Sequence, residues 1–230
     1  MGESRHNPNQ LLKAIKADEE NRNKGHLKIF FGYAAGVGKT YAMLEAAHME
    51  KQQGIDVVAG YVEPHARPKT AALLNGLEVL PTREVLYNGM ILNEFDIDMA
   101  LKRKPQLILV DELAHTNAEG CRHAKRYQDI KELLNAGIDV YTTVNVQHIE
   151  SLCDTVASIT EIVVRERIPD SLFDNADQVE LIDIEPQDLI DRLNTGNVYR
   201  QTQAKQMVEN FFTIENLTAL REIALRRCAD

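Results

Sequence analysis

The sequence predicts an α/β fold in which a mostly parallel sheet is flanked by helices and followed by a helical carboxyl-terminal extension. Apolar runs of strand length alternate along the chain with segments of helical periodicity. A glycine-rich loop joins the first of these strands to the next helix, which is the opening of a βαβ unit. Hydrophobic residues make up 44% of the chain and charged residues 27%, so its composition is that of an ordinary globular domain.

The first half of the chain supplies the βαβ unit. The apolar run from Leu27 to Phe31 is typical of a buried strand. Helical spacing over residues 40–53 stops at Gly54, which suits a helix end, and residues 55–62 read as the next strand. Weaker patterns add a helix over 7–24, a short helix over 68–76, an extended stretch over 77–87 and a helix from an Asp96 cap to Lys102.

The second half continues the alternation and then becomes helical. The predicted strands are 107–110, 138–144, 162–165 and 178–184, and the predicted helices are 125–136 and 146–157. From Pro186 the pattern is helical, with a break at 195–197, and it reaches Asp230 without a stop signal. We therefore expect a helical lead over 1–24, a domain over 25–195, and an extension over 196–230 that leads to a further domain of a longer protein.

Charge and cysteine usage narrow the functional classes. A net charge of −9 argues against a nucleic-acid-binding protein. The three cysteines include no CxxC pair, which favours free thiols in a reducing compartment. The start lacks the apolar core of a signal peptide, and no apolar run approaches the ~20 residues that span a bilayer. The sequence therefore predicts a cytoplasmic segment without membrane contact of its own.

The glycine-rich loop predicts a binding site for the phosphates of ATP. Glycines let backbone amides approach phosphate oxygens closely, a lysine can reach the β- and γ-phosphates, and a threonine hydroxyl can ligate Mg²⁺. The loop comprises Gly32, Tyr33, Ala34, Ala35, Gly36, Val37, Gly38, Lys39 and Thr40. The usual GxxxxGK[ST] spacing would place a glycine at position 33, so the entry to this P-loop (Walker A motif) is expected to differ, and Tyr33 is a candidate to cover the nucleotide.

The pair Asp111 and Glu112 ends a buried strand that we expect beside the strand of the glycine loop. Asp111, with Thr40, is then the candidate Mg²⁺ residue of a Walker B motif, and Glu112 is a candidate catalytic base that orients water. The alternative is that Asp111 only ends the strand and caps the next helix.

Polar side chains after two strands are further candidates for the nucleotide site. Thr116 and Asn117 lie in a long polar loop after Asp111, and Asn145 follows the strand 138–144. Loops at the carboxyl ends of parallel strands line ligand clefts, so these side chains are expected near the γ-phosphate. For Asn145, capping of the following helix is an equal alternative. His115, Cys121 and His123 match no standard zinc spacing.

Five stretches resemble the amino-terminal domain of the KdpD family of sensor histidine kinases. They are Phe31–Leu44, Val110–Asn117, Tyr141–His148, Val164–Asp170 and Ala219–Arg227. The resemblance implies a regulatory domain that binds ATP on the cytoplasmic side of a membrane-bound sensor of potassium limitation and osmotic stress. It also implies that the family shares the offset first glycine. The implied partners are the other cytoplasmic domains of the same kinase and, indirectly, a response regulator, KdpE.

Two other functions fit the residues less well. A free-standing P-loop ATPase or small-molecule kinase would use the same loop and Asp111–Glu112, but no acceptor pocket is evident in the sequence. A pure interaction domain would carry a degenerate loop. We expect this segment to be at most a slow ATPase, in which ATP reorganises residues 113–126, while the longer protein transfers phosphate from ATP to a histidine.

Overall fold

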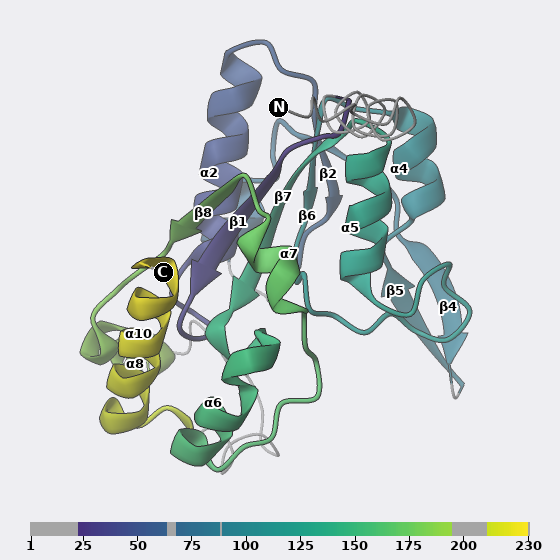
Figure 1. The fold of residues 1–230 in the computed structure, drawn as a ribbon. Coiled ribbons are helices and arrows are strands. Elements are labelled where there is room, and N and C mark those ends of the chain that lie inside the picture. Colours follow the sequence, from purple (N-terminus) through teal and green to yellow (C-terminus); the bar gives the residue numbers. More distant parts are fainter. Residues whose placement is uncertain (1–22, 64–67, 88, 195–210, 230) are drawn as a thin grey trace, which may run out of the picture.

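The computed structural model describes residues 23–63, 68–87, 89–194 and 211–229. Within these residues six parallel strands form one sheet in the order β3-β2-β6-β7-β1-β8, and two antiparallel strands form a separate hairpin (Figure 1). The sheet strands are β1 (Leu27–Gly32), β2 (Val57–Tyr61), β3 (Glu78–Val79), β6 (Leu107–Val110), β7 (Asp139–Asn145) and β8 (Gln178–Leu181). The hairpin strands are β4 (Arg83–Tyr87) and β5 (Met90–Glu94).

Helices cover both faces of the sheet, as Figure 1 shows with α2 on one side and α4 and α5 on the other. The helices are α2 (Lys39–Gln52), α3 (Pro68–Ala72), α4 (Ile97–Arg103), α5 (Arg126–Asn135), α6 (Cys153–Thr160), α7 (Asp170–Asp174), α8 (Pro186–Asn194) and α10 (Ile214–Ala229), with 3₁₀ turns η1 (Val146–His148) and η2 (Glu150–Leu152). Helices α6, α8 and α10 gather below the carboxyl ends of the strands in Figure 1. No helix in the described part of the chain is long and apolar enough to cross a bilayer.

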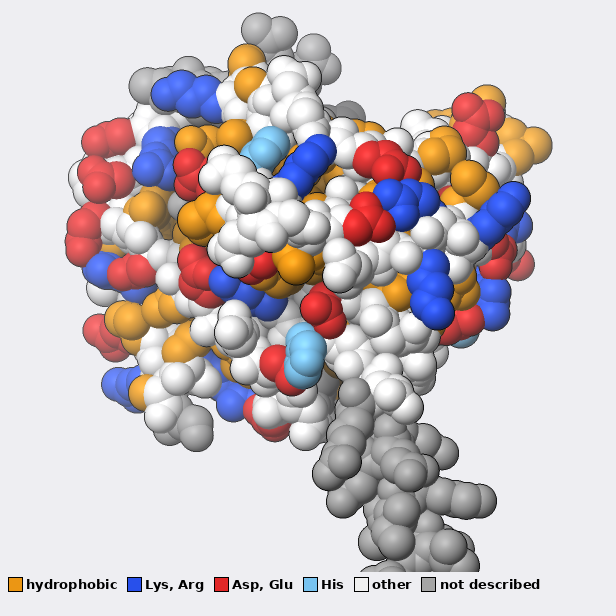
Figure 2. Space-filling model, turned by 90° about the horizontal axis from the view of Figure 1, so that it is seen from above, with side chains coloured by type: hydrophobic (Ala, Val, Ile, Leu, Met, Phe, Trp, Pro, Cys, Tyr) orange, Lys and Arg blue, Asp and Glu red, His pale blue; other side chains and the backbone are white. Residues whose placement is uncertain are grey.

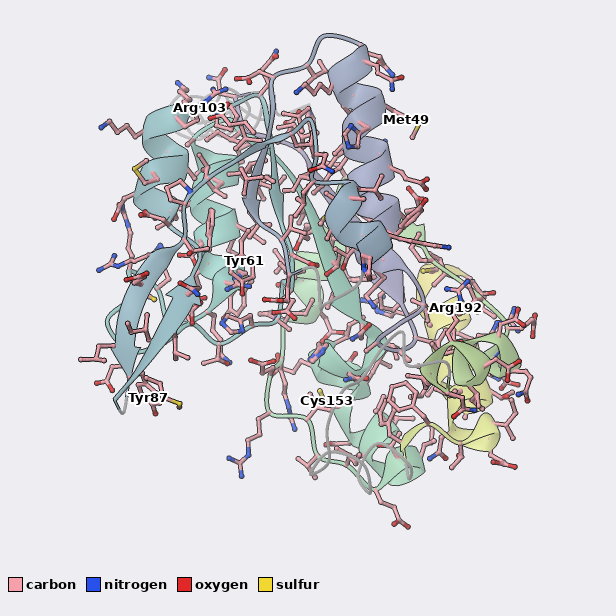
Figure 3. The ribbon with its side chains drawn as sticks, turned by 180° about the vertical axis from the view of Figure 1, so that it is seen from behind. Met49, Tyr61, Tyr87, Arg103, Cys153 and Arg192 are labelled. Atoms are coloured by element: carbon pink, nitrogen blue, oxygen red, sulfur yellow. The ribbon has the colours of Figure 1, made fainter. Side chains whose placement is uncertain are left out.

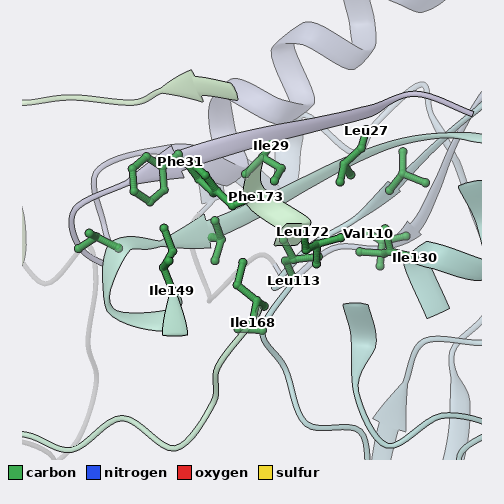
Figure 4. Packing of buried hydrophobic residues seen from close by; sticks show 14 of the residues in the cluster. Leu27, Ile29, Phe31, Val110, Leu113, Ile130, Ile149, Ile168, Leu172 and Phe173 are labelled. Carbon is green, nitrogen blue, oxygen red and sulfur yellow. The ribbon is translucent and has the colours of Figure 1, made fainter. Parts of the chain in front are cut away.

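Alternation along β1 explains the two hydrophobic layers. Leu27, Ile29 and Phe31 point into the larger core, on the side of α4, α5 and α10, and Figure 4 shows Phe31 close to Phe173. Phe30 points to the opposite face and packs in the second core, on the side of α2. Since successive side chains of a strand point to opposite faces, a strand that is apolar throughout must be covered on both sides. The apolar run that predicts a buried strand is interrupted only by the half-buried Lys28, and it therefore also accounts for the two helical layers.

Most of the predicted elements are confirmed. The α/β class, the parallel sheet, the helices on its faces and the carboxyl-terminal helix are all present. Asp96 caps α4, since its side chain accepts a hydrogen bond from the Met99 amide at 3.0 Å. Gly54 and Gly137 adopt positive φ just after α2 and α5, as expected for glycines that follow a helix. The predicted helix over 7–24 and the break at 195–197 fall outside the described residues.

Some expectations are wrong. Residues 162–165 form no strand; Val163 is 71% exposed, and Ile168 instead makes a single parallel bridge to Ile149. That bridge keeps Ile149 extended, so the helix predicted over 146–157 is broken into η1, η2 and α6. The strand carrying Asp111 is not adjacent to the glycine-loop strand, because β7 lies between β1 and β6.

The sequence pattern predicts only the first strand of the hairpin β4–β5. It projects from the body of the molecule, with Tyr87 near its tip in Figure 3, and Leu86 and Ile91 beside the tip are mostly exposed. The signal for the second strand was in the sequence, because an Asn-Gly pair, Asn88-Gly89, between apolar runs is a strong hairpin signal.

Acidic and basic side chains are interspersed over the face of the molecule seen from above in Figure 2. The described residues of that face therefore form no continuous basic surface there, in keeping with the net charge of −9.

Candidate functional site

A cavity of about 230 Å³ lies at the carboxyl ends of β1, β6 and β7. Its lining is formed by Ala35, Gly36, Gly38, Lys39, Thr40, Asp111, Glu112, Ala114, His115, Thr143, Val144, Asn145, His148 and Glu166. The parallel register explains this convergence: β1 and β7 pair so that Gly32 lies opposite Asn145. Loops that leave neighbouring parallel strands at one edge must meet there, which is where ligands bind in open α/β sheets.

The offset first glycine has a steric reason. A Cβ on Gly32 would lie 2.7 Å from Val37 Cγ2 and 3.1 Å from Lys39 Cδ, so the returning loop leaves no room for a side chain. Position 33 has the opposite requirement. Tyr33 is fully buried, and its hydroxyl donates to the Ile184 carbonyl at 3.1 Å. Tyr33 therefore lies in the core and does not line the cavity, and burial raises the pKa of its hydroxyl to about 12.

The loop then turns tightly into α2. Gly36 and Gly38 have φ of 96° and 115°, values that strain any other residue, and Gly38 is the cap residue of α2. Ala34 and Val37 are buried in the larger core and fix the loop to the sheet. Lys39 is only 9% exposed, and its Nζ donates to the Ala34 carbonyl at 3.0 Å, so the ammonium group is held inside the curve of the loop.

Thr40 and Asp111 meet across the cavity. The Thr40 hydroxyl donates to Asp111 Oδ2 at 3.1 Å. The other carboxylate oxygen accepts from the Thr143 hydroxyl and from the Glu112 amide, the latter at 3.1 Å. Asp111 is thus buried, oriented from three sides and placed beside a hydroxyl. A hydroxyl and a carboxylate side by side are the oxygen ligands that a hard cation such as Mg²⁺ prefers, so these residues fit the predicted metal site.

Glu112 follows in a strained conformation, with φ of 60°. The Glu112 amide also donates a hydrogen bond to Thr143 Oγ1 at 3.2 Å, which fixes the backbone at this turn. The side chain lines the cavity, and its Oε2 lies 3.9 Å from Arg126 Nη1. A carboxylate in this position can orient a water molecule beside a ligand in the cavity.

Arg126 connects the cavity to the hairpin. Its side chain is 0% exposed, donates to the Asp111 carbonyl at 3.2 Å and to Glu94 Oε2 at 3.1 Å, and stacks 4.1 Å from the Tyr61 ring. Glu94 is the last residue of β5 and also accepts from His115 Nε2 at 3.1 Å. Burial alone would raise the pKa of Glu94, but its hydrogen bonds from His115 and the Ala118 amide, with the charge of Arg126, lower it below the ordinary value.

His148 and Asn145 close the far side of the cavity. Nδ1 of His148 donates to the Glu166 carbonyl at 2.8 Å, and burial lowers the pKa of the ring. The ring is therefore neutral at pH 7, and its Nε2 is an acceptor. The Asn145 side-chain oxygen is buried without a hydrogen-bond partner among the described residues. A buried amide oxygen at a cavity wall is well placed to accept from a ligand or its water shell.

Thr116 and Asn117 are not brought to the cavity. Asn117 is buried, and its amide nitrogen donates to Asp129 Oδ2 at 2.7 Å and to the His123 carbonyl at 3.0 Å. The Thr116 amide donates to Glu166 Oε1 at 2.9 Å, and the Thr116 hydroxyl accepts from Lys125 Nζ at 2.6 Å. Both side chains therefore organise the loop over residues 113–126, and a role as nucleotide contacts stays a prediction for them.

Three residues of this region were missed from the sequence. Thr143 orients Asp111, and a threonine pair inside an otherwise apolar strand was a signal for it. Glu166 reaches the cavity because its segment crosses below the strands, and nothing in its local pattern indicated that. Glu94 stands at the end of the missed strand β5.

The comparisons with known proteins decide the family. Residues 23–230 match the family KdpD, described as "Osmosensitive K+ channel His kinase sensor domain". The chain belongs to the KdpD sensor-domain family. It is 62% identical over 226 residues to the Sensor protein KdpD of Clostridium acetobutylicum, and 56% identical over 226 residues to that of Escherichia coli K12. Both matches cover 98% of this chain.

A relative from Mycobacterium tuberculosis, also named Sensor protein KdpD, is 53% identical over 207 residues, or 90% of this chain. The chain spans about a quarter of the length of these KdpD relatives, since it covers 25%, 25% and 24% of them. The cavity therefore belongs to the KdpD sensor domain itself, and all its described lining residues fall within the matched range.

Proposed function

We propose that this KdpD domain is a P-loop module that binds ATP with Mg²⁺ and thereby regulates the sensor histidine kinase of which it is part. The observation that carries the proposal is the meeting of Lys39, Thr40 and Asp111 on one cavity at the carboxyl ends of parallel strands. A nucleoside triphosphate with its cation is bound by a lysine at the start of a helix, a hydroxyl beside it and a carboxylate opposite.

Each group has a distinct task. The amides of residues 35–40 and the amino end of α2 attract the phosphate oxygens. Lys39 neutralises the outer phosphates, exchanging its bond to the Ala34 carbonyl for bonds to the ligand. Thr40 and Asp111 are the residues that would hold Mg²⁺, which when bound would neutralise further phosphate charge. The side-chain oxygen of Asn145 and Nε2 of His148 accept hydrogen bonds from water molecules around the ligand.

ATP binding is expected to change the conformation of residues 113–126. Residues 113–126 follow Glu112, which lines the cavity, and end at Arg126, which contacts both Asp111 and the hairpin. A phosphate group that repels Glu112 or accepts a hydrogen bond from His115 alters the ion pairs at Arg126 and Glu94. The loop then changes conformation and signals occupancy to neighbouring domains. Hydrogen exchange of residues 113–126 is expected to slow in saturating ATP–Mg²⁺, and unchanged exchange would refute this step.

Titration calorimetry with ATP, ADP and a non-hydrolysable analogue, with and without Mg²⁺, tests the binding itself. The wild-type domain is expected to bind ATP more tightly with Mg²⁺ than without. Lys39→Ala should weaken binding by at least about tenfold, or 1.4 kcal/mol, whereas Lys102→Ala, an exposed lysine on α4, should leave it unchanged. Equal affinity of both variants would mean that the loop is degenerate and the domain only an interaction module.

The wider role concerns the whole protein. We propose that it senses potassium limitation or osmotic stress from the cytoplasmic side of a membrane and passes phosphate from ATP through its histidine to a KdpE-like response regulator. ATP in this domain then sets the balance between phosphorylation and dephosphorylation of the regulator. Phosphotransfer by the full-length protein should change with Lys39→Ala; identical time courses would separate the ATP site from signalling.

A second candidate, a free-standing ATPase or small-molecule kinase, is favoured only by the position of Glu112 on the cavity. Hydrolysis would need Glu112 to orient water, and Glu112→Gln would then abolish it. Phosphate release well above ~1 s⁻¹, the low end of ordinary enzyme rates, would support this function. We expect slower release, in line with a domain that senses ATP.

A further inference from the structure

A second cavity, of about 720 Å³, adjoins the glycine loop on its other side. It is lined by Gly36, Val37, Gly38, Tyr41, Ala42, Pro68, Lys69, Thr70, Ile182 and Arg192. Gly36 and Gly38 belong to the lining of both cavities. The two cavities therefore adjoin the same two glycines of the loop, so a ligand held by the loop amides could extend into both.

The two cavities differ in chemistry. The first carries Lys39, Asp111, Glu112 and two histidines, which suit phosphates and a cation. The walls of the second are mainly apolar. Tyr41 stands in the first turn of α2, is 39% exposed and presents an aromatic ring to this cavity. Ile182, which follows β8, also lines this cavity, and its Cγ2 lies 3.9 Å from where a Cβ on Gly38 would be.

We infer that the second cavity holds the base of the nucleotide whose phosphates occupy the first, with the ring of the base against Tyr41 and Ile182. This inference rests on the function proposed above and adds the subsite that reads the rest of the ligand. A nucleotide joins an anionic chain to a flat ring with apolar faces, and these two cavities offer the matching surfaces on either side of one loop. Aromatic side chains are sequence-tolerant stacking surfaces for bases.

The rim of the cavity is cationic. Arg192 on α8 and Lys69 on α3 line it, and Figure 3 shows Arg192 near the lower end of α2. Both groups donate hydrogen bonds and accept none, so they suit the ring nitrogens of a base or the oxygens of its sugar. The described lining contains no carboxylate, which leaves the anionic end of the ligand no repulsion from this side.

The test compares ATP with inorganic tripolyphosphate, both with Mg²⁺, by titration calorimetry. The wild-type domain should bind ATP at least about tenfold more tightly than tripolyphosphate. Tyr41→Ala should remove most of that difference by weakening ATP about tenfold, a loss of about 1.4 kcal/mol, while tripolyphosphate affinity is kept. Tyr41→Phe retains the ring and should bind ATP as the wild type does.

Two controls make the test specific. Met49→Ala truncates another exposed apolar side chain of α2, at the far end of the helix in Figure 3, and should change neither affinity. Ile182→Ala tests the second side chain proposed to contact the base, with its folding checked by thermal unfolding, and should weaken binding of ATP but not of tripolyphosphate. Equal affinities of the wild type for ATP and tripolyphosphate would overturn the base subsite and leave the phosphate site standing. No binding of either ligand would instead overturn the proposed function.

Discussion

The hydroxyl of Thr40 donates a hydrogen bond of 3.1 Å to the carboxylate of Asp111, although the two residues lie 71 positions apart in the chain. Thr40 belongs to α2 and Asp111 follows β6, so the bond joins the two parts of the proposed cation site before any ligand enters. A preorganised pair of this kind reduces the ordering that binding requires.

Thr40→Val tests that relationship directly, because valine has nearly the shape of threonine and lacks the hydroxyl. We expect it to lose the Mg²⁺-dependent part of ATP affinity, about tenfold or more, while Mg²⁺-free binding changes little. Thr40→Ser keeps the hydroxyl and should retain the Mg²⁺ effect. Calorimetry with and without Mg²⁺ measures both, and an unchanged Mg²⁺ effect in Thr40→Val would contradict the assignment.

Gly32→Ala is expected to damage binding more than folding. The new methyl group would press on Val37 and on the stem of Lys39, and so displace the ammonium group from the loop. ATP affinity should fall about tenfold or more. Gly54→Ala is the matched control: its φ is +91° and nothing lies within 4 Å, so it should cost about 1 kcal/mol of stability and leave affinity unchanged. Wild-type affinity in Gly32→Ala would show that the steric argument is wrong.

Arg126→Met should lower the free energy of unfolding by about 3–5 kcal/mol, because it leaves the buried Glu94 without its guanidinium partner. Arg122→Met provides the comparison. Arg122 pairs with Asp98 and Glu132, but its side chain is 44% exposed, and such pairs contribute about 1 kcal/mol or less. Urea denaturation measures both variants. Similar losses of unfolding free energy in the two variants would mean that burial does not make the ion pair at Arg126 more stabilising than an exposed one.

Asp129 should give stability a component that falls as pH rises. Burial raises the pKa of its carboxyl from 3.8 to about 6, against smaller opposing effects of Asn117, His123 and Arg126, while the charge of Glu132 acts with burial. A folded-state pKa above the unfolded one means that this contribution is complete below about pH 4 and is lost as the pH passes 6.

Urea denaturation between pH 4 and 7 tests that component. Asp129→Asn should remove it, so that the variant gains stability relative to the wild type as the pH rises. Asp154→Asn, at an exposed position on α6, should run parallel to the wild type. A constant difference between Asp129→Asn and the wild type across this range would show that Asp129 does not titrate as proposed.

Local pattern predicts most of the sheet, because strands buried on both faces, such as β6, are largely apolar. It failed where pairing between distant segments decides the structure. The order of the strands, with β7 between β1 and β6, leaves no trace in any one segment. The extended Ile149, held by its bridge to Ile168, overrode a helical pattern for the same reason.

The candidate site followed the same division. Lys39, Thr40, Asp111 and Asn145 lie on the cavity because a motif or a strand end fixes their position. Thr116 and Asn117 lie elsewhere, since the loop folds back and the Asn117 side chain donates to Asp129 of α5. Tyr33 was the ambiguous residue. Its place in the core follows from crowding at Gly32, a contact between positions five and seven residues apart that spacing alone does not reveal.

Among the described residues, the polar contacts that hold the hairpin β4–β5 to the rest of the domain lie at one end of it, at Arg83 and Glu94. Glu94 anchors it to Arg126, His115 and the Ala118 amide, whereas Tyr87 stands near the free end. Five residues of strand reach roughly 17 Å, so turning the anchored corner by roughly 10° carries the free end through about 3 Å. The hairpin therefore amplifies movement. A small displacement of the ion pairs at Glu94 becomes, at Leu86 and Ile91 near the free end, a shift as large as an atom.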